Sequence, residues 1–150
     1  MGCINLHTGL TQYYRGVDSS LWAIYNDDFN HIGSTLHFID DSIDGGGIID
    51  QVLLDTRDIT FGDNIDDIFL KTCMLGTELL ERSLDKIFSN KYHIIKIKNG
   101  KLFQIKDKSE EVVLIVNKKI NQFLQILWPK IILRLTMLIL VLEETSLVPG

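Results

Sequence analysis

The sequence has few residues of the kinds that cross-link or stiffen a chain. Two prolines and two cysteines occur among 150 residues, and Cys3 and Cys73 are too far apart to form a metal-binding pair. No disulfide framework is expected, and this cysteine usage favours a reducing compartment, which we take to be the cytoplasm. Residues 1–10 also lack the basic start and apolar run of a signal peptide.

The sequence has no excess of basic residues. Fifteen Lys and Arg against twenty Asp and Glu give a net charge of −5. Nucleic-acid binding is not expected, because phosphate contacts need clustered basic side chains. Apolar residues make up 45% of the chain and charged residues 23%, which is ordinary for a folded domain. The length fits one domain or a piece of a larger one.

No long apolar run occurs before the last quarter of the chain. Residues 131–142 (IILRLTMLILVL) are apolar apart from Arg134 and Thr136. Twelve residues are fewer than the ~20 that a membrane span needs, so membrane association is not expected. Residues 129–150 are treated as an atypical apolar tail. Three interpretations stay open: a buried or partner-binding helix, a tail foreign to the fold such as a frameshifted end, and a membrane anchor.

The hydrophobic patterns predict an alternation of strands and helices. Three segments are predicted as strands: 2–6, 32–39 and 48–54. Three segments are predicted as helices: 18–25, 64–90 and 110–128. The second and third strands are expected to pair antiparallel through the loop 40–47, which holds three Asp and three consecutive Gly.

A hairpin signal follows the long helix. Asn99-Gly100 separates two alternating apolar runs, which predicts a β-hairpin over 92–105. The whole order indicates an α/β fold with a mixed sheet, flanking helices, and a C-terminal hairpin and helix. The expected units are 1–90, an appendage over 91–128, and the tail 129–150.

Asn5 and His7 are the first candidates for chemistry. They lie two residues apart on a predicted strand, so their side chains point to the same side. An amide donor beside an imidazole can stabilise negative charge that develops on an oxygen, and a histidine can move a proton near neutral pH. On spacing alone, the favoured interpretation is a capping Asn and a structural loop His.

Asp44 lies in the glycine-rich loop between the second and third predicted strands. A carboxylate that faced His7 would raise the pKa of the imidazole and fix its orientation. An ordinary turn aspartate is the alternative, and Asp40 and Asp41 compete for any role. The three consecutive glycines match no phosphate-binding motif.

Other polar and aromatic residues give weaker signals. Arg15 precedes a predicted helix and could bind an anion or be a solvated loop charge. Tyr13, Tyr14 and Trp22 could form a stacking surface, although helix packing explains Trp22 equally well. Three further histidines lack ligand-like spacing and are interpreted as structural: His31, His37 and His93.

Three stretches together carry a family resemblance: NLHTGLTQYYRG (5–16), the WAI of 22–24, and IGSTLHFIDDSIDGGGII (32–49). They resemble the second half of the Rossmann-like catalytic domain of formyltransferases that use 10-formyltetrahydrofolate. The resemblance covers 2–54 well and 55–105 in general character. These sequence stretches are most similar to the branch that acts on nucleotide-linked amino sugars. Thr11-Gln12 stands where formyltransferases usually have a proline.

The resemblance implies a set of site residues and a chemistry. The implied catalytic residues are Asn5, His7 and Asp44. The implied contacts to the folate are Asp40, Ile43 and Gly45. The implied contacts to the substrate are Tyr13, Tyr14, Arg15 and Trp22. The reaction would transfer the formyl group of 10-formyltetrahydrofolate to an amine, and it needs no metal.

The resemblance also implies that the N-terminal half of the catalytic domain is missing from this chain. The expected protein is therefore a formyltransferase or a truncated remnant of one, and its activity alone is an open question. A homo-oligomer, or a partner that supplies the other half, would complete the site. The alternatives are a methionyl-tRNA formyltransferase-like protein and a non-catalytic fragment that acts only in protein association.

Overall fold

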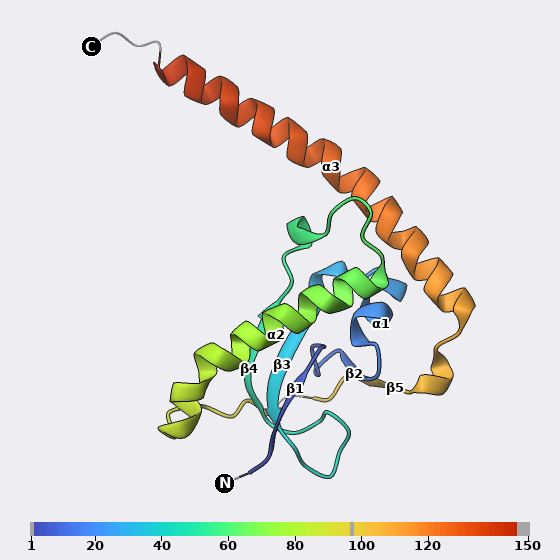
Figure 1. Ribbon diagram of the computed structural model, residues 1–150, viewed down its shortest axis with the longest axis vertical. Helices are drawn as coiled ribbons and strands as arrows, with labels where there is room; N and C mark the ends of the chain where they lie inside the picture. The colour runs from blue at the N-terminus through green and yellow to red at the C-terminus, as the bar shows by residue number, and fades with distance from the viewer. Residues whose placement is uncertain (1, 97, 147–150) are drawn as a thin grey trace.

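The computed structural model describes residues 2–96 and 98–146, and a three-stranded sheet forms the centre of its globular part (Figure 1). The strands are β1 (Ile4–His7), β3 (Gly33–Phe38) and β4 (Ile48–Leu53), in the order β1-β3-β4. Both neighbouring pairs are antiparallel. The three predicted strands and the antiparallel pairing of the last two are confirmed, and β1 forms an edge of this sheet.

The long helix α2 (Ile65–Phe88) packs against the sheet, as Figure 1 shows. It begins at Asn64, whose side chain accepts a hydrogen bond from the Asp67 backbone while the Asp67 carboxylate accepts one from the Asn64 backbone. This reciprocal capping satisfies two N–H groups that the first turn would otherwise leave unpaired. Leu79 and Ile87 of α2 pack on Leu36 of β3 in a small apolar cluster. The helix predicted over 64–90 is confirmed.

A larger hydrophobic core lies beside the sheet, where α1 (Ser19–Tyr25) contacts the first half of α3 (Glu110–Ser146). Trp22 from α1 stacks on Phe103, with ring centroids 4.3 Å apart. The buried residues Val116, Ile120 and Leu124 supply the face of α3. They lie four residues apart, which places them on one side of the helix. Three short 3₁₀ turns complete the helical elements: Phe29–His31, Thr56–Asp58 and Ile105–Asp107.

The hairpin predicted over 92–105 is wrong. Instead, β5 (Lys101–Phe103) pairs in parallel with β2 (Tyr14–Gly16), far away in the sequence. The Gly100 N–H donates to the Thr11 carbonyl at 2.9 Å. A Cβ on Gly100 would lie 2.2 Å from the Tyr13 carbonyl carbon. Gly100 therefore permits close approach to the early loop, and its glycine signal was misinterpreted as a hairpin turn.

Helix α3 continues through Pro129, so the expected boundary between 110–128 and the tail is not a break in secondary structure. Its second half leaves the globular part, as the red end of the ribbon shows (Figure 1). Leu133 and Leu138 are 64% and 55% exposed. The described part of the tail is therefore not buried by this chain, which removes the buried helix and leaves the partner-binding helix open. One stretch of the described chain, Glu110–Ile139, is long and apolar enough to cross a membrane, which is weak evidence alone.

Candidate active site

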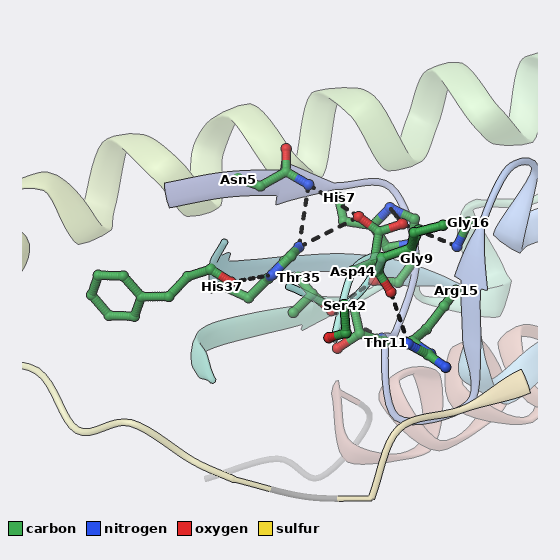
Figure 2. A network of polar contacts seen from close by, with 12 residues as sticks. Asn5, His7, Gly9, Thr11, Arg15, Gly16, Thr35, His37, Ser42 and Asp44 are labelled. Carbon is green, nitrogen blue, oxygen red and sulfur yellow. Dashed lines mark hydrogen bonds and ion pairs between the residues drawn. The ribbon is translucent and has the colours of Figure 1, made fainter. Parts of the chain in front are cut away.

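The structure brings Asn5, His7 and Asp44 together at the end of β1 (Figure 2). The Asn5 amide nitrogen lies 3.3 Å from Asp44 Oδ1 and donates a hydrogen bond to it. His7 Nδ1 lies 3.6 Å from Asp44 Oδ2. The first two side chains come from one strand, and the third comes from the loop between β3 and β4. The sequence places them up to 39 residues apart, so their meeting is a property of the fold.

Backbone geometry holds the carboxylate of Asp44 in place. Asp44 has a φ of 47°, in the left-handed region, where Asp is tolerated better than most residues. Its Oδ2 accepts a hydrogen bond from the Gly16 N–H at 3.0 Å. The side chain is 16% exposed. The carboxylate therefore has donors on both oxygens while one side stays open to solvent.

His7 is buried and oriented from its other ring nitrogen. Its Nε2 lies 3.0 Å from Ser19 Oγ, and that hydroxyl lies 3.2 Å from the Tyr14 carbonyl, to which it donates. Gly9 fits close beside this pair, because a Cβ there would lie 2.4 Å from the Ser19 Cβ and 2.6 Å from His7 Nε2. Ser19 was not predicted as a site residue, since it carried only a helix-start signal.

The pKa of His7 departs from the sequence-based expectation. Burial lowers the pKa of the His7 imidazole below its ordinary value, and this effect outweighs the rise caused by the Asp44 carboxylate. The nearby His37 lowers it further. The Asp44 carboxylate raises the pKa of His7 as expected, but desolvation is the larger effect, so the net shift is downward.

His37 belongs to the same cluster, although its sequence spacing suggested only a structural role. Its Nε2 lies 3.2 Å from the Asn5 amide nitrogen and 3.7 Å from Asp44 Oδ1. The β1–β3 register pairs Asn5 with His37 and His7 with Thr35. Strand pairing would have provided the missing signal, because directly opposite residues of an antiparallel pair share a face.

Thr35 and two glutamines brace the loop that follows β1. The Thr35 hydroxyl donates to the Gly9 carbonyl at 2.6 Å. The Gln51 amide nitrogen lies 2.7 Å from Thr35 Oγ1 and 2.6 Å from Gln12 Oε1. The Gln12 amide nitrogen donates back to Gln51 Oε1 at 2.9 Å. Sequence reasoning gave none of these residues a role.

A cleft of about 270 Å³ lies beside the loop 40–47. Its lining comes from three segments: Thr11, Gln12, Asp40, Gly45, Gly46, Gly47, Ile48, Ile95, Lys96 and Asn99. Two of the three expected folate contacts, Asp40 and Gly45, therefore line it. Ile43 does not; its exposed side chain lines a separate open apolar groove with Leu102 and Ile105.

The four expected substrate contacts are divided between surface and core. Tyr13 is 41% exposed and stacks on His31, with ring centroids 3.9 Å apart. Trp22 is 5% exposed and packed in the core, so the expectation that it contacts substrate is not supported. Tyr14 is also buried. Its hydroxyl donates to Asp28 at 3.0 Å, and burial with this bond raises the pKa of Tyr14 to about 12.

Arg15 makes contacts within the protein rather than presenting a free guanidinium. Its Nε donates to the Gly100 carbonyl at 2.9 Å, and its Nη1 donates to the Ile43 carbonyl at 2.8 Å. Arg15 thereby joins the loop 40–47 to the segment before β5. In the described residues, no group of three or more His, Cys, Asp or Glu side chains is arranged to hold a metal ion.

Comparison with known proteins relates this geometry to a class of enzymes. No protein-family model matches the sequence. A methionyl-tRNA formyltransferase from Flavobacterium psychrophilum is 38% identical over 87 residues, which are 58% of this chain and 26% of the relative. The matched part therefore spans about a quarter of that relative's length.

Two solved structures share both fold and sequence with the chain. An N-formyltransferase from Helicobacter canadensis, in complex with folinic acid and dTDP-3-aminofucose, has a TM-score of 0.61 and 29% identity, over 71% of this chain and 39% of that one. A formyltransferase from Anoxybacillus kamchatkensis, in complex with UDP-4,6-dideoxy-4-formamido-L-AltNAc and tetrahydrofolate, has a TM-score of 0.62 and 27% identity, over 70% and 53%.

In both fold and sequence, the chain is similar to part of these formyltransferases. The predicted resemblance to the formyltransferase family, including its sugar N-formyltransferases, is confirmed by these relatives and neighbours.

Proposed function

We propose that this chain carries the catalytic residues of an enzyme that transfers a formyl group from 10-formyltetrahydrofolate to an amine. The observation that carries the proposal is the meeting of Asn5, His7 and Asp44 at one sheet edge. The similarity to formyltransferases supports it independently, because that similarity does not use the geometry of these side chains.

The proposed reaction begins when the lone pair of the amine attacks the formyl carbon. A carbon–nitrogen bond forms, and the formyl oxygen becomes a tetrahedral oxyanion. Asn5 and His7 would donate hydrogen bonds to that oxygen, since both can present an N–H. The Ser19 hydroxyl donates to the Tyr14 carbonyl and can only accept from His7 Nε2, so the single N–H of a neutral His7 is on Nε2. Donation to the oxyanion therefore uses a proton on Nδ1, which the Asp44 carboxylate favours and burial opposes. The oxyanion then reforms the carbonyl as the bond between the formyl carbon and the folate nitrogen breaks, and the folate nitrogen takes up the proton that the attacking amine loses.

The attacking amine must lose a proton during the transfer. Asp44 is the proposed acceptor, directly or through one water molecule, because its carboxylate is partly open to solvent beside both donors. The Gly16 N–H and the Asn5 amide hold its two oxygens. A carboxylate fixed by such donors keeps its direction without reorganising during the reaction.

The cleft beside the loop 40–47 is the proposed binding place for part of the folate. It adjoins Asp44, and the consecutive residues Gly45, Gly46 and Gly47 line it. Without side chains, these residues let a planar ring approach the backbone closely. We propose Asp40 and Gly45 as contacts there, and Ile43 as a contact on the neighbouring apolar groove.

A nucleotide-linked amino sugar is the proposed amine substrate. The support comes from two neighbours whose structures contain dTDP-3-aminofucose and a UDP-linked formamido sugar. Exposed Tyr13 and the apolar groove by Leu102 offer surfaces for a base or a sugar. Arg15 would contribute to substrate binding indirectly, because its hydrogen bond to the Ile43 carbonyl positions the loop 40–47.

Formylation of methionyl-tRNA is the second candidate. It is favoured by the 38% identity to a methionyl-tRNA formyltransferase, which exceeds the identity to the two sugar-formyltransferase structures. The net charge of −5 opposes it, because tRNA binding needs basic surface. A non-catalytic role in protein association is the third candidate.

The test uses the full 150-residue chain, incubated with 10-formyltetrahydrofolate and a dTDP-linked amino sugar. We expect a product heavier by one formyl group in mass spectrometry, and its loss in the Asp44→Asn variant. The exposed Asp41→Asn on the same loop is the matched control and should keep the activity. Methionyl-tRNA replaces the sugar in a parallel reaction, and product only there would select the second candidate.

Folate binding is measured separately, by calorimetry with tetrahydrofolate. Binding without transfer would indicate that the chain holds the donor site but lacks a complete catalytic apparatus. If the chain shows no folate binding and no transfer to either acceptor, the proposed function is contradicted and the non-catalytic alternative remains.

A further inference from the structure

We propose that His37 is a positioning residue that holds the Asn5 amide in the orientation needed to donate to the reacting oxygen. The inference rests on the function proposed above, but its structural part depends only on contacts within the chain. His37 is 2% exposed, and it lies directly opposite Asn5 in the β1–β3 pairing. The sheet therefore fixes the distance between the two side chains.

The tautomer of His37 follows from its backbone contact. Its Nδ1 lies 2.9 Å from the Phe38 carbonyl oxygen. A carbonyl oxygen can only accept a hydrogen bond, so Nδ1 carries a proton. In the neutral ring, Nε2 then has a free lone pair and can act only as an acceptor. That lone pair points to the Asn5 amide nitrogen, 3.2 Å away.

The orientation of Asn5 follows independently from Asp44. The carboxylate oxygen Oδ1 lies 3.3 Å from the Asn5 amide group, and an ionised carboxylate accepts hydrogen bonds only. The NH₂ end of Asn5 must therefore face Asp44, because its carbonyl end would repel the carboxylate. The same NH₂ group faces His37, so both neighbours require the same orientation of the amide. Figure 2 shows these contacts converging on Asn5.

This arrangement prepares Asn5 for charge that develops only during the reaction. A neutral imidazole nitrogen is a weaker acceptor than an oxyanion. The Asn5 N–H that donates to His37 can therefore donate to the formyl oxygen instead as that oxygen gains negative charge. A neutral carbonyl oxygen gains less from this change of acceptor. Without His37 the amide can rotate and present its own oxygen, which would repel the oxyanion.

The test compares two substitutions of His37 in the full chain. The Gln amide of His37→Gln reaches the place of Nε2 and can still accept from Asn5, whereas the shorter Asn of His37→Asn mimics only Nδ1. We expect kcat to fall about tenfold to a hundredfold in His37→Asn, with KM for 10-formyltetrahydrofolate unchanged and kcat largely restored in His37→Gln. An equal loss in both variants, or a loss of thermal stability with unchanged kcat, would overturn the positioning role.

Nuclear magnetic resonance tests the same inference without turnover. We expect ¹⁵N shifts of the native His37 ring that identify the Nδ1–H tautomer. The Asn5 side-chain NH₂ signals should move strongly in His37→Asn and little in His37→Gln. An Nε2–H tautomer, or unmoved Asn5 signals in both variants, contradicts the inference. Absence of folate binding by the native chain would instead contradict the proposed function, so the two failures are distinguishable.

Discussion

The imidazole of His7 is subject to opposing influences from its surroundings. Burial and the neighbouring His37 lower its pKa, while the Asp44 carboxylate raises it. We therefore expect the Asp44→Asn substitution to lower the pKa of His7 further, because it removes a negative charge that favours the protonated ring. A pH titration of the His7 ring signals by nuclear magnetic resonance measures this shift.

The exposed Asp41→Asn provides the control for that titration, since it removes a carboxylate from the same loop. It should leave the His7 titration close to that of the native chain. A His7 pKa that stays constant or rises in Asp44→Asn would show that the ring does not sense this carboxylate.

The same buried ring makes stability depend on pH. In the unfolded chain His7 titrates near its ordinary value of about 6.5, while in the folded chain its pKa is lower. Below about pH 6.5 the unfolded state therefore binds more protons, and its population is favoured. We expect the free energy of unfolding, measured with urea, to fall as the pH decreases from 7.5 to 5.5. A His7→Gln variant should show a smaller decrease over this range, and an identical decrease would assign the effect to other groups.

Residue types and spacing offered Asn5, His7 and Asp44 only as candidates, and the family resemblance singled them out as the three central side chains. Neither of these predicted His37 or Ser19. His37 joins the cluster only through the register of β1 with β3, and Ser19 only through the close approach permitted by Gly9. The sequence also does not show locally that His7 is buried, so the rise caused by Asp44 was predicted but the larger lowering of the His7 pKa by burial was not.

At the scale of elements, α3 has two halves with different environments. Ile120 is fully buried in the core, whereas Leu133 is 64% exposed. We expect Ile120→Ala to lower the free energy of unfolding by about 2–5 kcal/mol, because it leaves a cavity among packed side chains. Leu133→Ala should change it by less than about 0.5 kcal/mol. Urea unfolding of both variants makes the comparison, and a similar large loss for Leu133→Ala would mean that the second half of α3 is packed in solution.

The elements were predictable to different degrees for identifiable reasons. Helix α2 carries a long apolar period and a capping Asn64, so its sequence specifies it locally. The pairing of β5 with β2 has no local sequence signature. Asn99-Gly100 instead favoured pairing with the segment just before it, as a hairpin over 92–105. Pro129 suggested the end of a helix, because proline removes a donor and crowds the preceding turn. The strong helix formers on both sides of it continue α3 instead.

At the scale of the whole molecule, Arg15 joins segments that are distant in the sequence. It donates to the carbonyls of Ile43 and Gly100 from two different nitrogens. Lys has one terminal nitrogen and no planar fork, so it cannot reproduce both bonds. We expect Arg15→Lys to speed amide hydrogen exchange in the loop 40–47, with β3 unchanged as the internal control. Equal protection of that loop in both proteins would show that Arg15 does not restrain it.

The parallel pairing of β2 with β5 has a consequence for how the protein is made. Tyr14 is matched with Lys101, so the chain between them must be synthesised before this pair can form. The antiparallel sheet and its Asn5–His37 match involve only earlier residues and can assemble first. A ribosome-bound nascent chain would therefore form its central sheet early. The hydrogen bonds by which Arg15 joins Gly100 to the loop 40–47 would form only after β5 has emerged.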